Sequence, residues 1–246
     1  MGSEIYRYLD IDKSMLSQSL LLFLEELWAH NNKDRMDDNR AWYKDVREEF
    51  VVFVKRLMRI YSSINPAFHG LKIGEVMFRI NKDVRFSKDK SPYKPRLSAY
   101  FSPEGKKSPF IGPYIHIQPG NNSFIGGGLH HPEPWVLKAF RRHIAIDHHA
   151  FTKILTRKDF TWFFGSLTGE SLKTAPQWYS QDHSAIDILR YKSFYFSHLL
   201  SDKELIHSDF VDVCEQSMRI AQPFSVYIND IVREAREISD EEIFID

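Results

Sequence analysis

Apolar residues in the N-terminal third recur every three or four positions, which predicts two amphipathic helices. The first is expected from Leu20 to Trp28 and is followed by a polar loop. The second is capped by Asp38 or Asn39 and ends at Asn65-Pro66, because a residue that precedes proline is disfavoured in a helix. Its apolar stripe reads Trp42, Val46, Phe50, Phe53, Leu57, Ile60 and Ile64. We expect these two helices to pack on each other.

Beyond Gly70 the pattern changes to short β-favouring runs separated by glycine and proline. Strands are expected at 76–80, 97–101, 114–118 and 123–125, with further ones near 160–165 and 193–199. A third helix should begin at Pro134 and continue to Leu155, and two closing helices should be separated by Pro223. Strands grouped between helical ends indicate an α+β fold with a largely antiparallel or mixed sheet, packed against N-terminal and C-terminal helices.

Composition favours one domain over residues 1–246, because no Pro/Gly/Ser-rich spacer or repeat divides the chain. Lys plus Arg equal Asp plus Glu at 33 each, so the molecule has no global field to attract polyanions. The single cysteine, Cys214, cannot form an internal disulfide and lies on an apolar stripe, where we expect a buried thiol. No membrane span or signal peptide is indicated, and a cytoplasmic location is expected.

The densest chemical signal is a basic segment from Arg79 to Arg96. It holds seven basic residues against two acids, Asp83 and Asp89. Guanidinium groups form bidentate hydrogen bonds with phosphates or carboxylates, and lysine ammonium groups add compact positive charges. The segment therefore suits an anionic ligand. The alternative is a solvated turn in which the two acids pair with their neighbours. The seven are Arg79, Lys82, Arg85, Lys88, Lys90, Lys94 and Arg96.

The run from Phe78 to Lys94, FRINKDVRFSKDKSPYK, resembles the signature of the domain of unknown function 2461 family. The likeness extends over about residues 20–230. Two departures stand out: residues 33–38 split segments that are nearly contiguous in the family pattern, and Lys82 stands where arginine is usual. The resemblance implies no particular activity. The other landmarks are residues 23–32 and 39–43, Gly126-Gly127-Gly128 with Pro132 and Arg141, and residues 169–173 with Pro176, Tyr179 and His183.

Proline restricts the second half of the basic segment. Pro92 fixes its own φ and biases Ser91 away from helix, so residues 88–94 should form a rigid extended or turn segment. Phe86 is expected to anchor this segment to the core, whereas Tyr93 could anchor it or line a pocket. Alternation along the predicted strand directs Arg79 away from the core, toward a pocket shared with Arg85.

A glycine triplet, Gly126 to Gly128, precedes the helix expected from Pro134. It is read as a plain glycine-rich turn, with close approach of backbone amides to an anion as the alternative. Arg141, on the second turn of that helix, could face the same ligand or form a surface ion pair.

The eleven histidines offer no convincing metal motif, and neither a metal nor a cofactor is expected. His143 and Asp147 stand four residues apart on one predicted helix face, which permits two ligands but specifies no third. For proton transfer the candidates are His183, beside Asp182, and Asp89.

Three classes of function fit these residues. The leading hypothesis is a binding or catalytic pocket for an anionic, phosphorylated ligand. An interaction module would instead dock an acidic partner through the basic segment. A weak nucleic-acid-binding module is the third class, and the neutral net charge counts against it. The residues assigned to ligand binding are Arg79, Arg85, Lys88, Lys90, Tyr93, Lys94 and Arg141.

Overall fold

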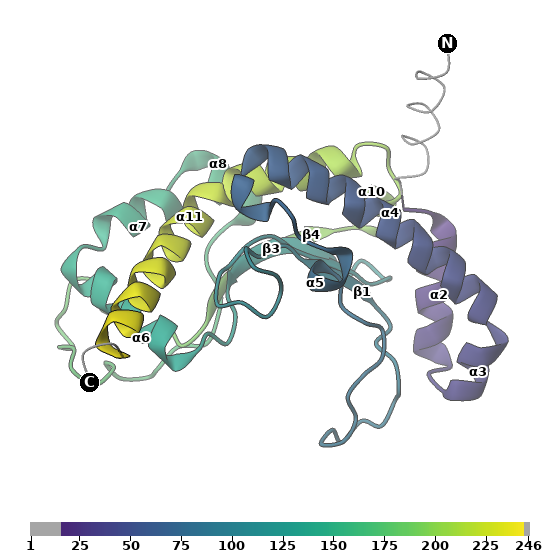
Figure 1. Cartoon of the computed structure of the whole chain (residues 1–246), viewed down its shortest axis with the longest axis horizontal. Helices are drawn as coiled ribbons and strands as arrows, with labels where there is room; N and C mark the ends of the chain where they lie inside the picture. Colours follow the sequence, from purple (N-terminus) through teal and green to yellow (C-terminus); the bar gives the residue numbers. More distant parts are fainter. Residues whose placement is uncertain (1–15, 244–246) are drawn as a thin grey trace, which may run out of the picture. The chain divides into compact units, whose positions relative to one another are not determined.

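The computed structural model describes residues 16–243, about half of them helical, and confirms the α+β fold class (Figure 1). A four-stranded antiparallel sheet has the order β1-β2-β3-β4. The strands are β1 (Leu97–Tyr100), β2 (Tyr114–Ile117), β3 (Ser123–Leu129) and β4 (Phe194–Leu200). The helices are α2 (Gln18–Ala29), α3 (Lys33–Asp38), α4 (Arg40–Ile64), η1 (Pro66–Phe68), α5 (Ile73–Val76), α6 (Pro134–Ile146), α7 (His149–Leu155), α8 (Lys158–Phe164), α9 (Ile186–Leu189), α10 (Asp202–Leu205) and α11 (Phe210–Ile243).

Internal contacts divide the chain into two compact units. Of the described residues, unit 1 holds 16–101, 114–125 and 199–216, and unit 2 holds 102–113, 126–198 and 217–243. Strands β3 and β4 contribute residues to both units. Among the described residues, no helix is long and apolar enough to cross a membrane.

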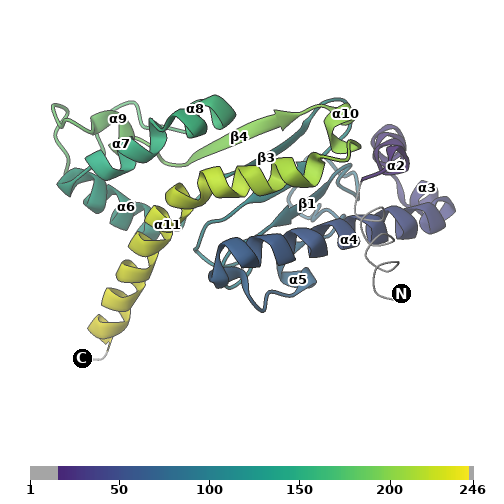
Figure 2. The same ribbon diagram turned by 90° about the horizontal axis from the view of Figure 1, so that it is seen from above.

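The helices of unit 1 follow the predicted apolar spacing. Ser17 caps α2 by accepting a hydrogen bond from the Leu20 amide at 3.3 Å, and α4 begins after Asn39 and ends before Asn65, as expected. The polar loop predicted after α2 is wrong, because Asn32 caps the short helix α3 there. Figure 2 shows α2 and α3 beside the N-terminal part of α4.

Stacked aromatic rings form the core of unit 1. The Phe53 and Phe210 rings are parallel at 5.3 Å, and Tyr61 packs edge-on against Phe101 at 4.8 Å. The Tyr61 hydroxyl donates to the Cys214 carbonyl oxygen at 3.2 Å. Cys214 is fully buried, which confirms the expected core thiol, and burial raises its pKa well above the usual range.

The strand predicted at 76–80 is only partly present. Helix α5 occupies residues 73–76, and the chain then extends along the free edge of β1. Met77 forms a bridge with Ala99, and the Phe78 amide donates to the Ser98 carbonyl at 3.0 Å. Strands at 97–100 and 114–117 form as predicted and pair antiparallel, with Ser98 opposite His116.

Unit 2 is built around phenylalanines. Phe194 and Phe196 of β4 lie 4.6 Å from Phe140 and 5.0 Å from Phe224, respectively, as measured between ring centroids. The strand predicted near 160–165 is wrong: these residues form α8, with Phe160 buried against Phe196 at 5.1 Å. Short aromatic runs do not distinguish a strand from a buried helix.

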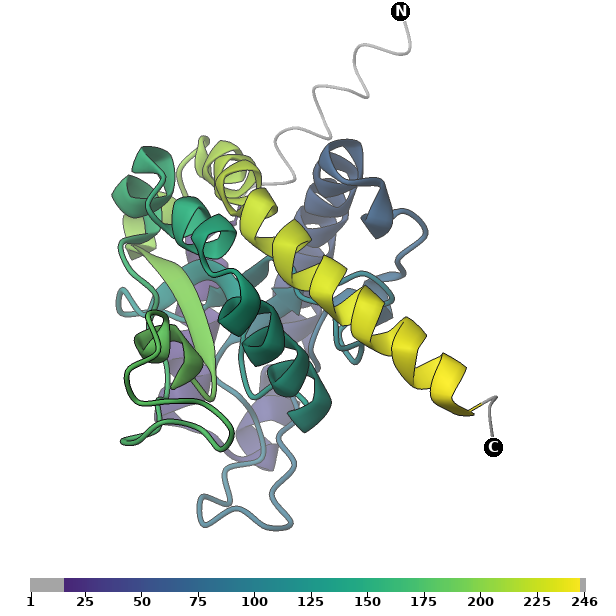
Figure 3. The ribbon, with the colours of Figure 1, turned by 90° about the vertical axis from the view of Figure 1, so that its left-hand side faces the viewer.

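Two helix boundaries in unit 2 also differ from prediction. The single helix expected from Pro134 is two helices, because Asp147 ends α6 in an extended conformation. The teal ribbon in Figure 3 shows these successive helices. Pro223 does not separate two helices but lies inside α11, and Figure 2 shows that helix bent along its length. An internal proline removes one backbone hydrogen bond and bends a helix without necessarily ending it.

The glycine triplet lies within β3 and is not a turn. Gly128 has φ of +134°, and a Cβ there would lie 2.5 Å from the Phe194 carbonyl oxygen. Close packing of the β3 and β4 backbones therefore accounts for this glycine.

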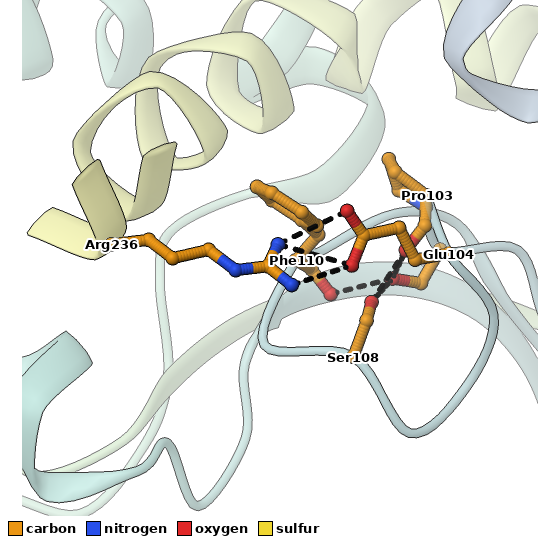
Figure 4. A network of polar contacts seen from close by, with 6 residues as sticks. Pro103, Glu104, Ser108, Phe110 and Arg236 are labelled. Atoms are coloured by element: carbon orange, nitrogen blue, oxygen red, sulfur yellow. Dashed lines mark hydrogen bonds and ion pairs between the residues drawn. The ribbon is translucent and has the colours of Figure 1, made fainter. Parts of the chain in front are cut away.

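Side chains from α11 fasten the 102–113 loop of unit 2. Asn229 accepts from the Ile111 amide at 2.8 Å and donates to the Ile111 carbonyl at 2.9 Å. About two turns further along α11, Arg236 makes a bidentate ion pair with Glu104 at 3.0–3.2 Å and lies 5.7 Å from the Phe110 ring centroid (Figure 4). The buried hydrogen bonds of Asn229 and the exposed ion pair of Arg236 together hold the 102–113 loop against α11.

Candidate functional site

A long excursion between α5 and β1, residues 77–96 and here called the arm, leaves β1 on the side away from α4 (Figures 1 and 3). Its two limbs are paired near the base. The Lys82 amide donates to the Pro92 carbonyl and the Lys94 amide to the Ile80 carbonyl, each at 2.8 Å. The arm is therefore held by backbone bonds although most of it has no regular secondary structure.

Both carboxylates of the arm form ion pairs with neighbouring basic side chains. Asp83 receives the Arg85 guanidinium at 2.7 and 3.0 Å, and Asp89 receives the Lys82 ammonium at 2.5 Å. Asp89 also accepts two hydrogen bonds from Ser91. These donors, Lys82 foremost, hold the pKa of Asp89 well below its usual range, so Asp89 is an ionised structural carboxylate at neutral pH.

Five basic residues of the arm have no carboxylate within ion-pair distance among the described residues: Arg79, Lys88, Lys90, Lys94 and Arg96. Three of these lie at its base. Burial lowers the pKa of Lys94, and the positive charges of Arg96 and Arg79 lower it further. The Lys94 ammonium donates to the Arg79 carbonyl at 3.3 Å. We call Arg79, Lys94 and Arg96 the basal cluster.

The tip of the arm faces solvent. The Phe86 ring is 96% exposed, so its expected role as a core anchor is wrong. Arg85 lies 5.9 Å over that ring and is itself largely exposed, as is Arg79. The two arginines that were expected to share a pocket, Arg79 and Arg85, are thus exposed to solvent, and Arg85 pairs with Asp83. Backbone bonds and ion pairs order the arm, and Phe86 contributes no burial to it.

Beside the base of the arm, β2 presents a chain of three hydrogen-bonding side chains. The Tyr114 hydroxyl lies 3.2 Å from Nδ1 of His116, and Nε2 of His116 lies 3.0 Å from Oε1 of Gln118. The residues alternate with buried Ile115 and Ile117, so all three project from one face of the strand. We call Tyr114, His116 and Gln118 the β2 relay.

Aromatic side chains from neighbouring segments surround the β2 relay. His116 is 7% exposed and stacks on Phe124 at 4.7 Å. Tyr114 meets the rings of Phe78, Tyr100 and Phe124 at 5.6–6.4 Å. This wall limits water access to the histidine while the tyrosine remains partly exposed.

Burial and charge both act on His116. Burial is the largest cause and lowers its pKa, the hydrogen bond to the Gln118 amide oxygen raises it, and the positive charge of Arg96 lowers it. The imidazole is therefore neutral at pH 7. Arg96 links the two groups of residues, because its charge acts on both Lys94 and His116.

Sequence reasoning missed the β2 relay. The signal is present in Tyr114-Ile115-His116-Ile117-Gln118, where hydrogen-bonding residues alternate with isoleucines over a predicted strand. Such alternation is also typical of any strand with one solvated face, so it does not by itself indicate chemistry.

Arg141 belongs to unit 2. Its Nε and Nη2 groups each donate at 2.9 Å, to the carbonyl oxygens of Leu189 and Tyr191. These bonds position the 189–191 segment against α6, and burial lowers the pKa of the guanidinium. Tyr93, in the arm, is half-buried. Ligand binding by either residue stays a prediction.

The other histidines have local partners. His143 lies 3.1 Å from Glu234, and Asp147 contacts His149 rather than His143. His183 accepts a hydrogen bond from the Ala185 amide at 3.0 Å, which shapes a turn. Across residues 16–243, no three or more His, Cys, Asp or Glu side chains gather as metal ligands would.

Comparison with known proteins yields one match. The family model described as "Conserved hypothetical protein (DUF2461)" matches residues 19–227, which includes the arm, the basal cluster and the β2 relay. No curated protein and no solved structure matches the chain.

Proposed function

The chain belongs to the DUF2461 family, and we propose that its unit 1 binds an anionic, phosphorylated ligand between the basal cluster and the β2 relay. The observation that carries this proposal is the grouping of Arg79, Lys94 and Arg96, none of which has a carboxylate within ion-pair distance among the described residues. The charge of Arg79 also acts on Asp83, but Asp83 is paired with Arg85. Like charges held together raise the free energy of the empty site, and a bound anion relieves that repulsion.

Phosphate suits this arrangement for two reasons. Arginine offers a planar fork of donors and lysine a compact charge, which together match the several oxygens of a phosphoryl group. Tyr114 and Gln118 add partly exposed polar groups beside Arg96, and these can orient the remainder of a ligand. The aromatic rings next to Tyr114 provide an apolar surface for an organic moiety.

Thermal unfolding with a panel of anions tests the proposal. Phosphomonoesters, inorganic phosphate and pyrophosphate are compared with chloride at matched ionic strength. A ligand at one hundred times its Kd adds about 2.7 kcal/mol of stability, which raises Tm by about 5 °C in a chain of this size. If every phosphorylated compound shifts Tm no more than chloride does, the proposal is wrong.

The tip of the arm favours a second function, docking of an acidic protein partner. Phe86 is almost wholly exposed, and Lys88 and Lys90 beside it have no carboxylate partner in the described chain. An exposed ring among positive charges is typical of an interaction surface. Replacing Phe86 by alanine should abolish capture of an acidic partner and leave phosphate binding unchanged, which separates the two functions.

A further inference from the structure

The partners of the two ring nitrogens in the β2 relay favour one tautomer of His116. The amide oxygen Oε1 of Gln118 can only accept, so Nε2 of the neutral imidazole carries the proton. Nδ1 then has a free lone pair and accepts the proton of the Tyr114 hydroxyl at 3.2 Å. A hydroxyl, a base in contact with it and a third group that orients the base are the three parts of an activated nucleophile.

We propose that Tyr114 is a nucleophile toward phosphoryl groups, with His116 as its general base and Gln118 as a positioning residue. This inference rests on the proposed function, because the basal cluster supplies the charge that holds the phosphoryl group. The substrate class is a phosphomonoester. Tyr114 is the catalytic residue because its hydroxyl oxygen meets the reacting phosphorus.

The step balances without a cofactor. Tyr114 Oη forms a bond to phosphorus, the bond from phosphorus to the ester oxygen breaks, and the tyrosine proton moves to Nδ1 of His116. The resulting imidazolium returns that proton to the leaving alkoxide, which departs as an alcohol. Water then attacks the phosphorus of the phosphotyrosine and gives a proton to Nδ1, and the bond from phosphorus to Oη breaks. The imidazolium returns that proton to the phenolate oxygen, which restores Tyr114 and neutral His116 and releases inorganic phosphate. Arg96 neutralises charge on the phosphoryl oxygens throughout.

The surroundings of His116 suit a base at neutral pH. Ser98 faces it from β1, Phe124 from β3, and Tyr114 and Gln118 from its own strand. The charged group that acts on it is Arg96 of the arm. Burial and this positive charge keep the imidazole unprotonated. The aromatic wall limits bulk water at the imidazole, while the partly exposed Tyr114 leaves a path for the water that the second step needs.

Covalent labelling tests the nucleophile independently of any enzymatic activity. The probe is 4-carboxybenzenesulfonyl fluoride. The phenolic oxygen attacks its sulfur and fluoride leaves, and the carboxylate of the probe mimics an anionic ligand. Rates are read by peptide mass spectrometry at Tyr114, with the exposed Tyr195 as the comparison. We expect Tyr114 to react about 100-fold faster, the lower end of the range for general-base assistance.

The pH profile of the wild-type protein separates base assistance from simple ionisation. An unassisted tyrosine loses about tenfold in rate for each pH unit below its pKa, because only the phenolate reacts. Labelling of Tyr114 should instead stay level from pH 8 to below 6.5 and fall only when His116 becomes protonated. A tenfold fall per unit across this range would overturn the proposal, and this measurement needs no variant.

Variants provide a second comparison. Gln118→Ala should slow labelling of Tyr114 and Gln118→Glu should restore it, since a carboxylate also accepts from Nε2. His116→Asn should reduce the rate to that of Tyr195. Unchanged labelling in a folded His116→Asn protein overturns the proposal.

Inorganic phosphate distinguishes failure of this inference from failure of the proposed function. Protection of Tyr114 by phosphate, together with assisted labelling, supports both. If His116 assists the labelling of Tyr114 but phosphate does not protect Tyr114, the hydroxyl is activated by its base, and the proposal that it acts on phosphoryl groups is wrong. Phosphate binding with ordinary labelling retains the anion site and overturns the nucleophile.

Discussion

Gly126 of β3 lies so close to Phe196 of β4 that a Cβ on the glycine would be 2.2 Å from the phenylalanine carbonyl oxygen. Replacing Gly126 by alanine must therefore separate two backbones, and we expect a loss of about 3 kcal/mol or more in the free energy of unfolding. Gly74 is the matched control, because its Cβ would meet nothing within 4 Å in helix α5. Gly74→Ala should be neutral or stabilising by up to about 1 kcal/mol. Equal destabilisation of both variants in urea would contradict this packing.

Asn31 should control the mobility of the arm. Its side chain donates to the Tyr93 carbonyl at 2.9 Å and accepts from the Tyr93 amide at 3.1 Å. Asn31→Ala removes both bonds, so trypsin should cut within residues 82–90 several-fold faster than in the wild type. Asn32→Ala is the control, since it removes only the cap of α3. The interpretation fails if the two variants are cleaved at the same rate.

Removal of the Arg96 charge should raise two pKa values. The positive charge of Arg96 lowers the pKa of both Lys94 and His116, so Arg96→Gln should raise each. Burial is the larger cause in both cases and persists, so His116 should still titrate below 6.5. NMR titration of the His116 ring and the Lys94 ε-carbon measures the change. Arg85→Gln should leave both values unaltered, because Arg85 pairs with Asp83.

The same histidine should make unfolding sensitive to pH. Its folded-state pKa lies below the unfolded value of 6.5, so the unfolded state binds more protons between the two values. Stability due to neutral His116 is present above pH 6.5 and is lost as pH falls toward the folded-state pKa. His116→Asn should flatten the urea midpoint over that window. A parallel fall in wild type and variant would assign the effect to other groups, of which His130 also has a lowered pKa.

The sequence predicted those features that depend on local periodicity. Long apolar stripes predicted α2 and α4, and short β-favouring runs separated by glycine and proline predicted β1 and β2. It was wrong at residues 160–165, because a short run of aromatic residues suits a buried helix as well as a strand. Pro223 was taken as a boundary, whereas the helix continues through it.

The candidate site was predictable only in part. The excess of positive charge on the arm can be counted from the sequence, but its distribution cannot. Asp83 and Asp89 form ion pairs with Arg85 and Lys82. Arg96 has no carboxylate within ion-pair distance among the described residues, so its charge can act on an incoming anion. The contribution of His116 depends on antiparallel pairing between β1 and β2, which brings it to the base of the arm. Pairing between segments this far apart is tertiary information that no local pattern contains.

Binding of inorganic phosphate, measured by isothermal titration calorimetry at fixed ionic strength, tests the central claim most directly. The proteins compared are the wild type, Arg96→Ala in the basal cluster and Arg85→Ala at the tip of the arm. Loss of one charge-assisted contact costs about 1.5–3 kcal/mol, so Arg96→Ala should weaken binding by about 10- to 150-fold. Arg85→Ala should bind like the wild type, because that guanidinium is already paired with Asp83. Wild-type binding retained in Arg96→Ala, or lost in Arg85→Ala alone, would contradict the account.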